Sequence, residues 1–282
     1  MIIFWGSKGV GKTTFLTALF YEIQQSNNKW TMFPACKHSD EFIKKSYEIL
    51  VKKNNFPPPT ELKDPETSTL KFEITQHLNN PIHKLLCWLN LKTQLKLKLD
   101  FLDPSGEFFE NPELEDHYEN FISKSIKRSK GILCLIDPDR KDQKDLNSMS
   151  YYQIFYENLI KIKNEFQSDD SFHKIPVPLA ICLTKMDQYE DYIHNPKQLA
   201  IERMGEVVFN LIERFFNPDL IKFFATSSVG FMEDGAPNLL LSPEGQPKLV
   251  IKPKPFNLIE PIKWIAQKSF KTHKGDSEKN GS

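Results

Sequence analysis

Residues 2–14 read IIFWGSKGVGKTT, and this stretch decides the fold. The short apolar run Ile2–Trp5 is typical of a buried β-strand. A loop from Gly6 to Thr13 follows at once and matches the pattern GxxxxGK[ST], in which glycines let backbone N–H groups wrap a phosphate chain. Residues 13–25 then carry apolar side chains at helical spacing, so the loop is predicted to open a helix whose N-terminus faces the phosphates.

The loop pattern assigns roles to individual side chains. Lys12 would reach the β- and γ-phosphates, and the hydroxyl of Thr13 would bind Mg²⁺. We therefore expect a nucleotide here, and the alternative is a glycine-rich turn without a ligand. The candidate phosphate-binding residues are Gly6, Ser7, Lys8, Gly9, Val10, Gly11, Lys12, Thr13 and Thr14.

A second motif, Asp103-Pro-Ser-Gly106, directly follows an alternating strand predicted for residues 94–102. A carboxylate at the C-terminal end of a strand beside the phosphate-binding loop can hold Mg²⁺, commonly through water. A glycine N–H at the same place can contact the γ-phosphate. The sequence therefore favours a metal and phosphate role for Asp103 and Gly106 over an ordinary Asp-Pro turn.

Thr184-Lys185-Met186-Asp187 ends a buried apolar run at 177–183 and matches the guanine-recognition pattern [NT]KxD. Its carboxylate can accept the N–H groups at N1 and N2 of guanine, whereas adenine would leave a buried carboxylate unpaired. The stem of Lys185 would pack along the purine face. Residues 226–228, Thr-Ser-Ser, end the next predicted strand, where a backbone N–H can support the guanine oxygen.

The order of elements predicts the fold class. Strands are predicted at 70–75, 94–102, 131–136, 177–183 and 221–225, and helices at 39–53, 111–130, 151–166, 195–216 and from 257. Ser39, Asn111, Asn195 and Asn257 are the predicted N-caps. The middle strands are continuously apolar, as in strands buried on both faces. We expect a three-layer α/β fold with a mostly parallel sheet and helices on both faces, in which the strands at 70–75 and 94–102 are antiparallel.

Composition excludes several classes of protein. Lys plus Arg total 37 and Asp plus Glu total 37, and this balance argues against a nucleic-acid backbone as the main partner. The four cysteines form no CxxC pair, which argues against a structural zinc site. No signal peptide, membrane-spanning run or prenylation cysteine is apparent, so we expect a cytoplasmic protein without a membrane anchor.

These motifs stand at strand ends in the order found in the translation-factor and Ras-like (TRAFAC) class of P-loop GTPases, which the chain resembles from Ile2 to its last helix. Within that class, four stretches look similar to bacterial double-GTPase-like proteins. Such proteins are associated with signalling or defence systems that couple a GTPase to effector proteins. The stretches are GKTTFLTALF at 11–20, the Pro-Pro-Thr loop ending at Thr60, DPSGE at 103–107 and PFNLIEPIKW at 255–264.

The resemblance implies a G domain at 1–270 with an inserted helix at about 39–53, a Gly/Pro-rich excursion at about 230–256 and a disordered tail at 271–282. It implies Mg²⁺-dependent hydrolysis of GTP to GDP and a nucleotide-dependent switch acting on an effector or activating protein. The implied metal ligands are Thr13, Thr60 and Asp103, and the implied base-binding residues are Thr184, Lys185, Asp187, Ser227 and Ser228. Thr67 and Thr69 rival Thr60 as the switch threonine.

Departures from the class pattern concern catalysis. Glu107 replaces the glutamine that usually orients the attacking water, and its charge would either accept that water or repel the γ-phosphate. Lys8 would either stabilise transition-state charge or lie solvated at the loop mouth. Intrinsic hydrolysis is therefore expected to be slow. A partner, or a second copy of the chain in a homodimer, would complete the site.

Other functions remain open on the sequence. A GTP-binding scaffold or sensor with negligible hydrolysis is compatible with Glu107. A P-loop ATPase or kinase requires that the match at 184–187 is a coincidence. Competition between GTP and ATP for binding separates the second alternative from a guanine-specific protein.

Overall fold

The computed structural model describes residues 1–6, 9–26, 30–58, 69–76, 95–101, 127–139, 174–242 and 247–279, with isolated positions at 156, 157, 159, 160, 163, 164, 166 and 245. Within these residues, the described helices contain no stretch of the length and apolarity needed to cross a membrane.

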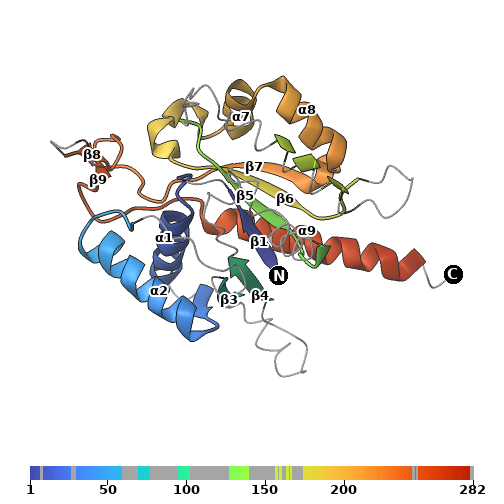
Figure 1. The fold of residues 1–282 in the computed structure, drawn as a ribbon, viewed down its shortest axis with the longest axis horizontal. Helices are drawn as coiled ribbons and strands as arrows, with labels where there is room; N and C mark the ends of the chain where they lie inside the picture. The colour runs from blue at the N-terminus through green and yellow to red at the C-terminus, as the bar shows by residue number, and fades with distance from the viewer. Residues whose placement is uncertain are drawn as a thin grey trace, which may run out of the picture.

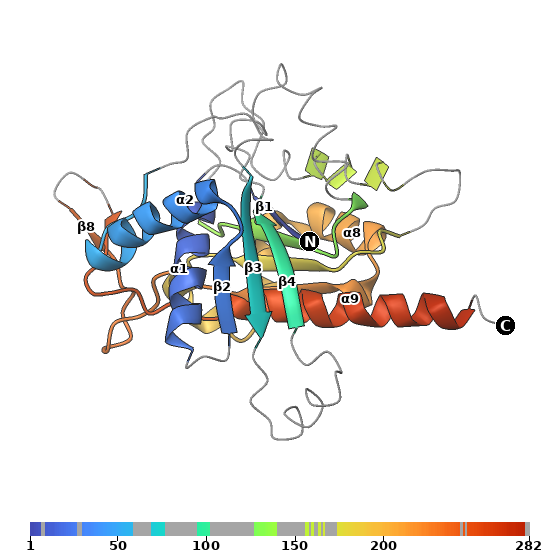
Figure 2. The same cartoon turned by 90° about the horizontal axis from the view of Figure 1, so that it is seen from below.

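The centre of the fold is a seven-stranded sheet in the order β2-β3-β4-β1-β5-β6-β7. Strands β4, β1, β5, β6 and β7 are parallel, whereas β3 pairs antiparallel with both β4 and β2. Figure 2 shows β2, β3 and β4 side by side in front of α9. The strands are β1 (Ile2–Trp5), β2 (Trp30–Pro34), β3 (Leu70–Gln76), β4 (Leu95–Phe101), β5 (Ile132–Ile136), β6 (Leu179–Leu183) and β7 (Ile221–Ala225).

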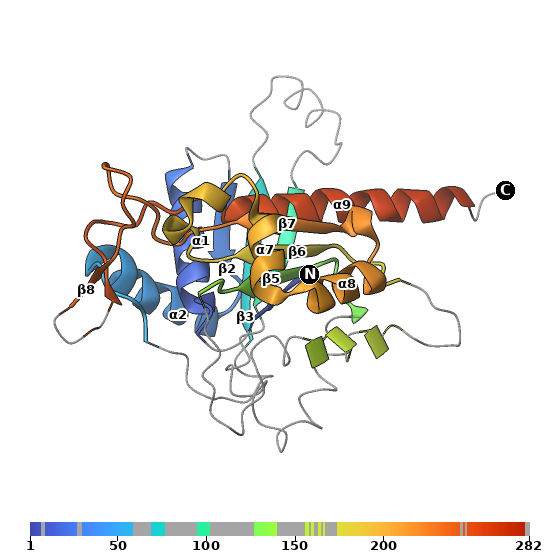
Figure 3. The same cartoon turned by 90° about the horizontal axis from the view of Figure 1, so that it is seen from above.

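Helices cover both faces of the sheet, as predicted (Figures 1 and 3). On β7, the ring of Phe223 meets Phe209 of α8, whereas the next ring, Phe224, meets Trp264 of α9. Successive strand residues point to opposite faces, so α8 and α9 lie on opposite sides. The α-helices are α1 (Lys12–Gln25), α2 (Lys37–Tyr47), α7 (Pro196–Met204), α8 (Glu206–Phe215) and α9 (Ile259–Lys279).

Short elements complete the described chain. A π-helical turn η1 (Glu48–Lys52) continues α2 directly, and the 3₁₀ turns are η4 (Met186–Gln188), η5 (Glu190–Tyr192) and η6 (Pro218–Leu220). A small hairpin of β8 (Leu240–Leu241) and β9 (Pro247–Lys248) lies away from the main sheet, within the Gly/Pro-rich stretch at about 230–256. Figure 1 shows it at the end of the molecule where α1 and α2 lie, opposite the C-terminal end of α9.

The core forms where the sheet meets these helices. Phe4 of β1 packs edge-on against Phe15 of α1, and both rings are fully buried. Strands β5 and β6 are buried along their whole length, as their continuous apolar composition predicts. The antiparallel pairing of β3 with β4 also matches the prediction.

Strand β2 was not predicted from the sequence. Its residues alternate, with Trp30 and Met32 buried and Phe33 exposed, and it adds an edge strand beyond β3. The stretch is short and ends in Pro34, a residue that central strands exclude. It becomes a strand because it pairs with β3, and no local sequence pattern predicts that pairing.

The predicted caps of two helices were wrong. Helix α2 begins at Lys37, and Ser39 is buried inside it, where its hydroxyl accepts the N–H of Lys71 at 2.8 Å. The side chain of Asn257 donates to the carbonyl of Ala225 at 3.1 Å, while the N–H of Leu258 donates to a carboxylate oxygen of Glu22. Long-range partners therefore replaced the local caps.

The helix expected at 195–216 is two helices. Gly205, with φ +79° and ψ 156°, separates α7 from α8. A glycine adopts this backbone conformation at low cost, which explains the break. At the C-terminus, α9 stays helical through Lys279, past residue 271 where we expected disorder to begin. Extending an existing helix costs less than starting one, which favours this continuation.

Candidate nucleotide-binding site

The candidate site lies where four parallel strands end at the same edge of the sheet. Trp5 of β1 is level with Cys134 of β5, and Ile136 is level with Leu183 of β6, which in turn is level with Ala225 of β7. The loops that follow these strands therefore lie side by side, in the order β1, β5, β6, β7. We call them the phosphate loop (6–13), the β5 turn (137–139), the base loop (184–188) and the β7 loop (226–230).

Glycines shape the phosphate loop for different reasons. A Cβ on Gly6 would lie 3.0 Å from the carbonyl oxygen of Leu135, so the loop needs glycine there to pass close to β5. Gly9 and Gly11 have φ of +80° and +89°, and among the described residues beyond their chain neighbours no atom lies within 4 Å of a Cβ built there. The backbone thus uses the left-handed region beside open space, as a phosphate cradle requires.

Lys12 folds back over this loop. Its Nζ donates to the carbonyl oxygen of Gly6 at 2.9 Å, and the residue is only 6% exposed. The side chain therefore runs from the first residue of α1 back to the end of β1. This arrangement places a cation within the loop that would hold the phosphates.

The start of α1 suits an anion. Its N-cap, Gly11, offers no side-chain acceptor, and the first turn carries no acidic residue. The first N–H groups of a helix have no intrahelical partner and lie at the positive end of its dipole. Thr13 and Thr14 are half-buried in this turn, next to Lys12.

The base loop presents a buried carboxylate. Asp187 is 3% exposed, and one of its oxygens accepts the hydroxyl of Ser227 at 2.5 Å. Burial raises the pKa of the Asp187 carboxyl above its ordinary value, while the Ser227 bond and the charge of Lys185 oppose the rise. Thr184 anchors the start of the loop, since its N–H donates to the carbonyl of Ile136 at 2.8 Å.

Ser227 acts through its side chain. Its backbone N–H donates to the carbonyl of Phe256 at 3.3 Å, and its hydroxyl oxygen accepts the N–H groups of Val229 and Gly230. Of the two serines predicted to bind the base, Ser228 is therefore the candidate whose N–H would support the guanine oxygen.

The β5 turn holds residues that sequence reasoning missed. Asp137 pairs with Lys185 at 2.6 Å, and Asp139 accepts the hydroxyl of Tyr189. Burial and the bond to Asp139 raise the pKa of Tyr189 to about 12. The signal that could have found them is the Asp-Pro-Asp triplet directly after a buried strand, the same position that the candidate base-binding residues occupy after β6.

The structure brings together the described members of the predicted site and leaves others untested. Thr69, one of the rival switch threonines, is buried at the start of β3. Within the described ranges, no cluster of His, Cys, Asp and Glu could hold a metal ion by itself. The predicted residues that lie outside the described residues are Ser7, Lys8, Thr60, Thr67, Asp103, Gly106 and Glu107.

No protein-family model matches the chain, and no curated protein is significantly similar to it. Among solved structures, the chain is similar to the signal recognition particle receptor SRb from Chaetomium thermophilum in an SRb-GTP/SRX complex. The identity is 13% and the TM-score is 0.41, over 82% of this chain and 92% of that one.

The chain is also similar to the Ski7 GTPase-like domain of S. cerevisiae bound to GDP and inorganic phosphate, with 17% identity and a TM-score of 0.43 over 80% of this chain and 42% of that one. A bacterial selenocysteine-specific elongation factor, EF-Sec, gives 15% identity and a TM-score of 0.34, and the match covers 25% of that chain. The chain thus spans less than half of the last two proteins. At these identities and TM-scores, the chemistry of the site rests on its own residues.

Proposed function

We propose that this protein binds guanine nucleotides at the edge of the sheet where the phosphate loop and the base loop meet. The observation that carries the proposal is the buried carboxylate of Asp187, which the hydroxyl of Ser227 orients. It follows a strand that ends at the same edge of the sheet as β1, after which the glycine loop opens α1. A carboxylate held in this way selects a base that presents adjacent N–H donors, which guanine does and adenine does not.

The phosphates of the nucleotide would lie against the phosphate loop and the first turn of α1. Lys12 would move its ammonium from the carbonyl of Gly6 to the β- and γ-phosphates, a short shift within the same loop. Mg²⁺, when bound, would neutralise phosphate charge. The half-buried hydroxyl of Thr13 fits as one ligand, and the sequence adds Asp103 and Thr60.

The reaction proposed for the site is hydrolysis of GTP to GDP and phosphate. Its support is the set of sequence motifs, because the residues that would act on water or order the switch are Glu107, Lys8 and Thr60. Turnover is expected to be slow without a partner, since neither the glutamine nor the arginine that usually assists is present in the motifs. We further propose that loss of the γ-phosphate changes how the protein binds an effector.

Calorimetric titration of the nucleotide-free protein with GTP, GDP and ATP in Mg²⁺ tests guanine binding. We expect tight binding of GTP and GDP and no detectable heat with ATP. Equal binding of ATP would show that the base loop does not select guanine. Single-turnover hydrolysis of bound GTP then separates an enzyme from a nucleotide-binding scaffold.

A substitution in the base loop makes the test specific. Asp187→Asn turns an acceptor oxygen into a donor and should shift preference from guanine to xanthine nucleotides, because xanthine presents a carbonyl where guanine presents an amine. We expect GDP affinity to fall at least about 100-fold while XDP affinity rises. An unchanged preference would remove Asp187 from the site.

A further inference from the structure

We infer that Asp137 is a positioning residue for guanine binding, which acts by holding the side chain of Lys185 against the face of the purine. The inference rests on the proposed function, because it concerns how the same site achieves its affinity. Asp137 lies in the β5 turn, and no sequence motif considered above includes it.

Asp137 and Lys185 form a close ion pair. Lys185 Nζ lies 2.6 Å from Asp137 Oδ2, although the two residues are 48 positions apart. The Asp137 side chain is 7% exposed and that of Lys185 is 41% exposed. A pair with one buried member is screened less by salt than two exposed charges are, so this contact holds better than a surface ion pair.

The ion pair sets the direction in which the Lys185 side chain runs. Strand β5 lies between β1 and β6 in the sheet, and Lys185 follows β6 while Asp137 follows β5. A lysine that starts at the end of β6 and reaches Asp137 must run toward the side on which β1 and the phosphate loop lie. A nucleotide that joins Asp187 to the phosphate loop has to cross the same gap. The methylene stem of Lys185 is therefore placed where the purine face would lie.

The side chain of Asp137 is itself held in place by a hydrogen bond. Its other oxygen, Oδ1, accepts the N–H of Asp139 at 3.0 Å, so a side-chain-to-backbone hydrogen bond within the β5 turn fixes the carboxylate. Asp139 in turn accepts the hydroxyl of Tyr189, just beyond the base loop. The β5 turn therefore contacts the chain on both sides of η4, through Lys185 before it and Tyr189 after it. Between these two residues, Asp187 accepts the hydroxyl of Ser227.

The backbone of Lys185 also favours this arrangement. It adopts φ +57° and ψ 28°, the left-handed region, at the point where the chain leaves β6 and enters η4. This conformation is unfavourable for a lysine, because its Cβ lies too close to the following carbonyl oxygen. The ion pair with Asp137 helps to offset that cost in the free protein.

Such an arrangement affects affinity through pre-organisation. A free lysine side chain loses rotamer entropy when a ligand immobilises it, whereas one already held by Asp137 loses less. Asp137 should therefore strengthen binding without touching the base edge. Its removal should weaken all purine nucleotides that fit the site by the same factor, because the face contact does not distinguish their edges.

The test uses the full chain and measures the affinities for GDP and IDP by calorimetry. Asp137→Asn keeps an oxygen to accept the N–H of Asp139 but loses the charge that holds Lys185. We expect both affinities to fall about fivefold to tenfold with their ratio unchanged. Asp191→Asn is the matched control, since this exposed aspartate lies in η5 beyond the base loop, and its affinities should equal those of the wild type.

A double-mutant cycle separates positioning from a structural role. Lys185→Met keeps the apolar stem and removes the charge, so Asp137→Asn should have no further effect on GDP affinity in that background. If Asp137 only braces the β5 turn, its substitution will lower GDP affinity equally in both backgrounds, and the inference is overturned. Thermal unfolding of each variant confirms that the proteins compared are folded.

The outcomes also separate this inference from the proposed function. If the wild type binds no GDP, the proposed function fails and this inference fails with it. If the wild type binds GDP and Asp137→Asn binds it as tightly, only the positioning role is overturned. A fall in GDP affinity that Lys185→Met abolishes supports both.

Discussion

The hydroxyl of Ser227 donates to the carboxylate of Asp187 at 2.5 Å, although the two residues are 40 positions apart in the chain. Ser227 is 1% exposed and Asp187 is 3% exposed, so the bond lies out of reach of solvent. The same serine oxygen accepts two backbone N–H groups of the β7 loop. One hydroxyl thus shapes the β7 loop and orients the carboxylate of the base loop.

Ser227→Ala should weaken GDP binding and make it more sensitive to pH. The Ser227 bond lowers the pKa of Asp187 against the effect of burial, so its loss raises that pKa further. Because guanine needs the ionised carboxylate, GDP affinity falls as pH falls through this pKa, and the variant should show the fall at higher pH. Calorimetry at several pH values measures it. A pH profile identical to that of the wild type would contradict the role of the bond.

Glu22 should make stability depend on pH. Its carboxylate accepts the N–H of Leu258 at 3.2 Å, and burial raises its pKa from 4.5 to about 7 despite this bond and the nearby charge of Lys263. The folded protein keeps a proton that the unfolded chain loses near pH 4.5. Glu22 therefore contributes its full stability below pH 4.5 and loses it as pH rises through about 7.

Glu22→Gln isolates this effect. The difference in unfolding free energy, wild type minus variant, should become less favourable to the wild type by on the order of 3 kcal/mol between pH 4.5 and pH 8. Urea denaturation of both proteins across this range measures it, and other titrating groups cancel in the difference. A difference that stays constant with pH would rule out the raised pKa.

Gly230 should tolerate no side chain. Its φ is +72°, and a Cβ there would lie 1.9 Å from the carbonyl oxygen of Lys254, a backbone atom that cannot move aside alone. We expect Gly230→Ala to lower the free energy of unfolding by about 3 kcal/mol or more. Gly235 has φ +85°, but within the described part of the chain a Cβ built there meets no atom within 4 Å beyond its chain neighbours, so Gly235→Ala should cost only about 1–2 kcal/mol. Equal losses in the two variants would show that the clash does not matter.

Asn238 should hold the excursion after β7 together. It is fully buried, its Oδ1 accepts the N–H groups of Val250 and Ile251, and its Nδ2 lies within 3.3 Å of the carbonyls of Val229, Ile251 and Lys252. Asn238→Ala leaves several of these groups without a partner and should cost about 3 kcal/mol or more. Denaturant unfolding measures the loss, and limited proteolysis should show faster cleavage near β8 and β9.

Asn238→Asp serves as the comparison. The carboxylate keeps the acceptor for the two N–H groups but faces the carbonyls without a donor. We expect it to be no more stable than Asn238→Ala at neutral pH. Wild-type stability in the aspartate variant would show that only the acceptor bonds matter.

Thr13→Val should separate nucleotide binding from its Mg²⁺ dependence. The substitution removes the hydroxyl at nearly constant volume, and the bond from Thr17 survives because it goes to the backbone carbonyl of Thr13. In Mg²⁺, GTP affinity should fall about tenfold or more. With the metal chelated, wild type and variant should bind GTP alike. A loss of the same size in chelator would place the hydroxyl on the phosphates instead.

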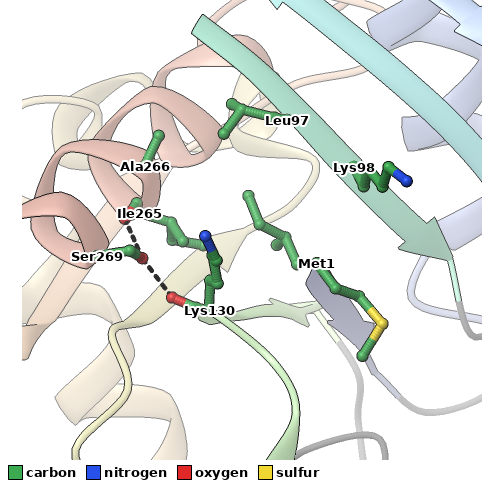
Figure 4. Close-up of a pocket in the computed structure, with 8 residues that line it drawn as sticks. Met1, Leu97, Lys98, Lys130, Ile265, Ala266 and Ser269 are labelled. Atoms are coloured by element: carbon green, nitrogen blue, oxygen red, sulfur yellow. Dashed lines mark hydrogen bonds between the residues drawn. The ribbon is translucent and has the colours of Figure 1, made fainter. Parts of the chain in front are cut away.

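A pocket lies at the edge of the sheet opposite the candidate site. It has a volume of about 290 Å³ and lies between α9, the first residues of β1 and the middle of β4 (Figure 4). Ser269 of α9 donates there to the carbonyls of Lys130 and Ile265. The bond to Lys130 joins α9 to the segment that leads into β5, so a side-chain hydrogen bond ties this helix to the edge of the sheet away from the candidate site.

Local pattern was sufficient for much of the fold. The apolar run at Ile2–Trp5, the glycine loop after it and the continuous apolar strands β5 and β6 each follow from neighbouring residues alone. The match at 184–187 likewise placed Asp187 at a strand end before any contact was known. Such features are visible in the sequence because backbone conformation and strand burial depend on composition over a few residues.

Tertiary structure decided which polar groups became partners. The residues next to Asp137 in the sequence do not indicate that it pairs with Lys185, 48 positions away. Likewise, the residues around Ser227 do not indicate that its hydroxyl binds Asp187, 40 positions away. Ser39 and Asn257 are residue types that commonly cap helices. Instead, Ser39 accepts a backbone N–H of β3, and Asn257 donates to the carbonyl at the end of β7. Burial makes an unpaired polar group costly, so each takes the partner that the completed fold brings within reach, and sequence distance does not limit that choice.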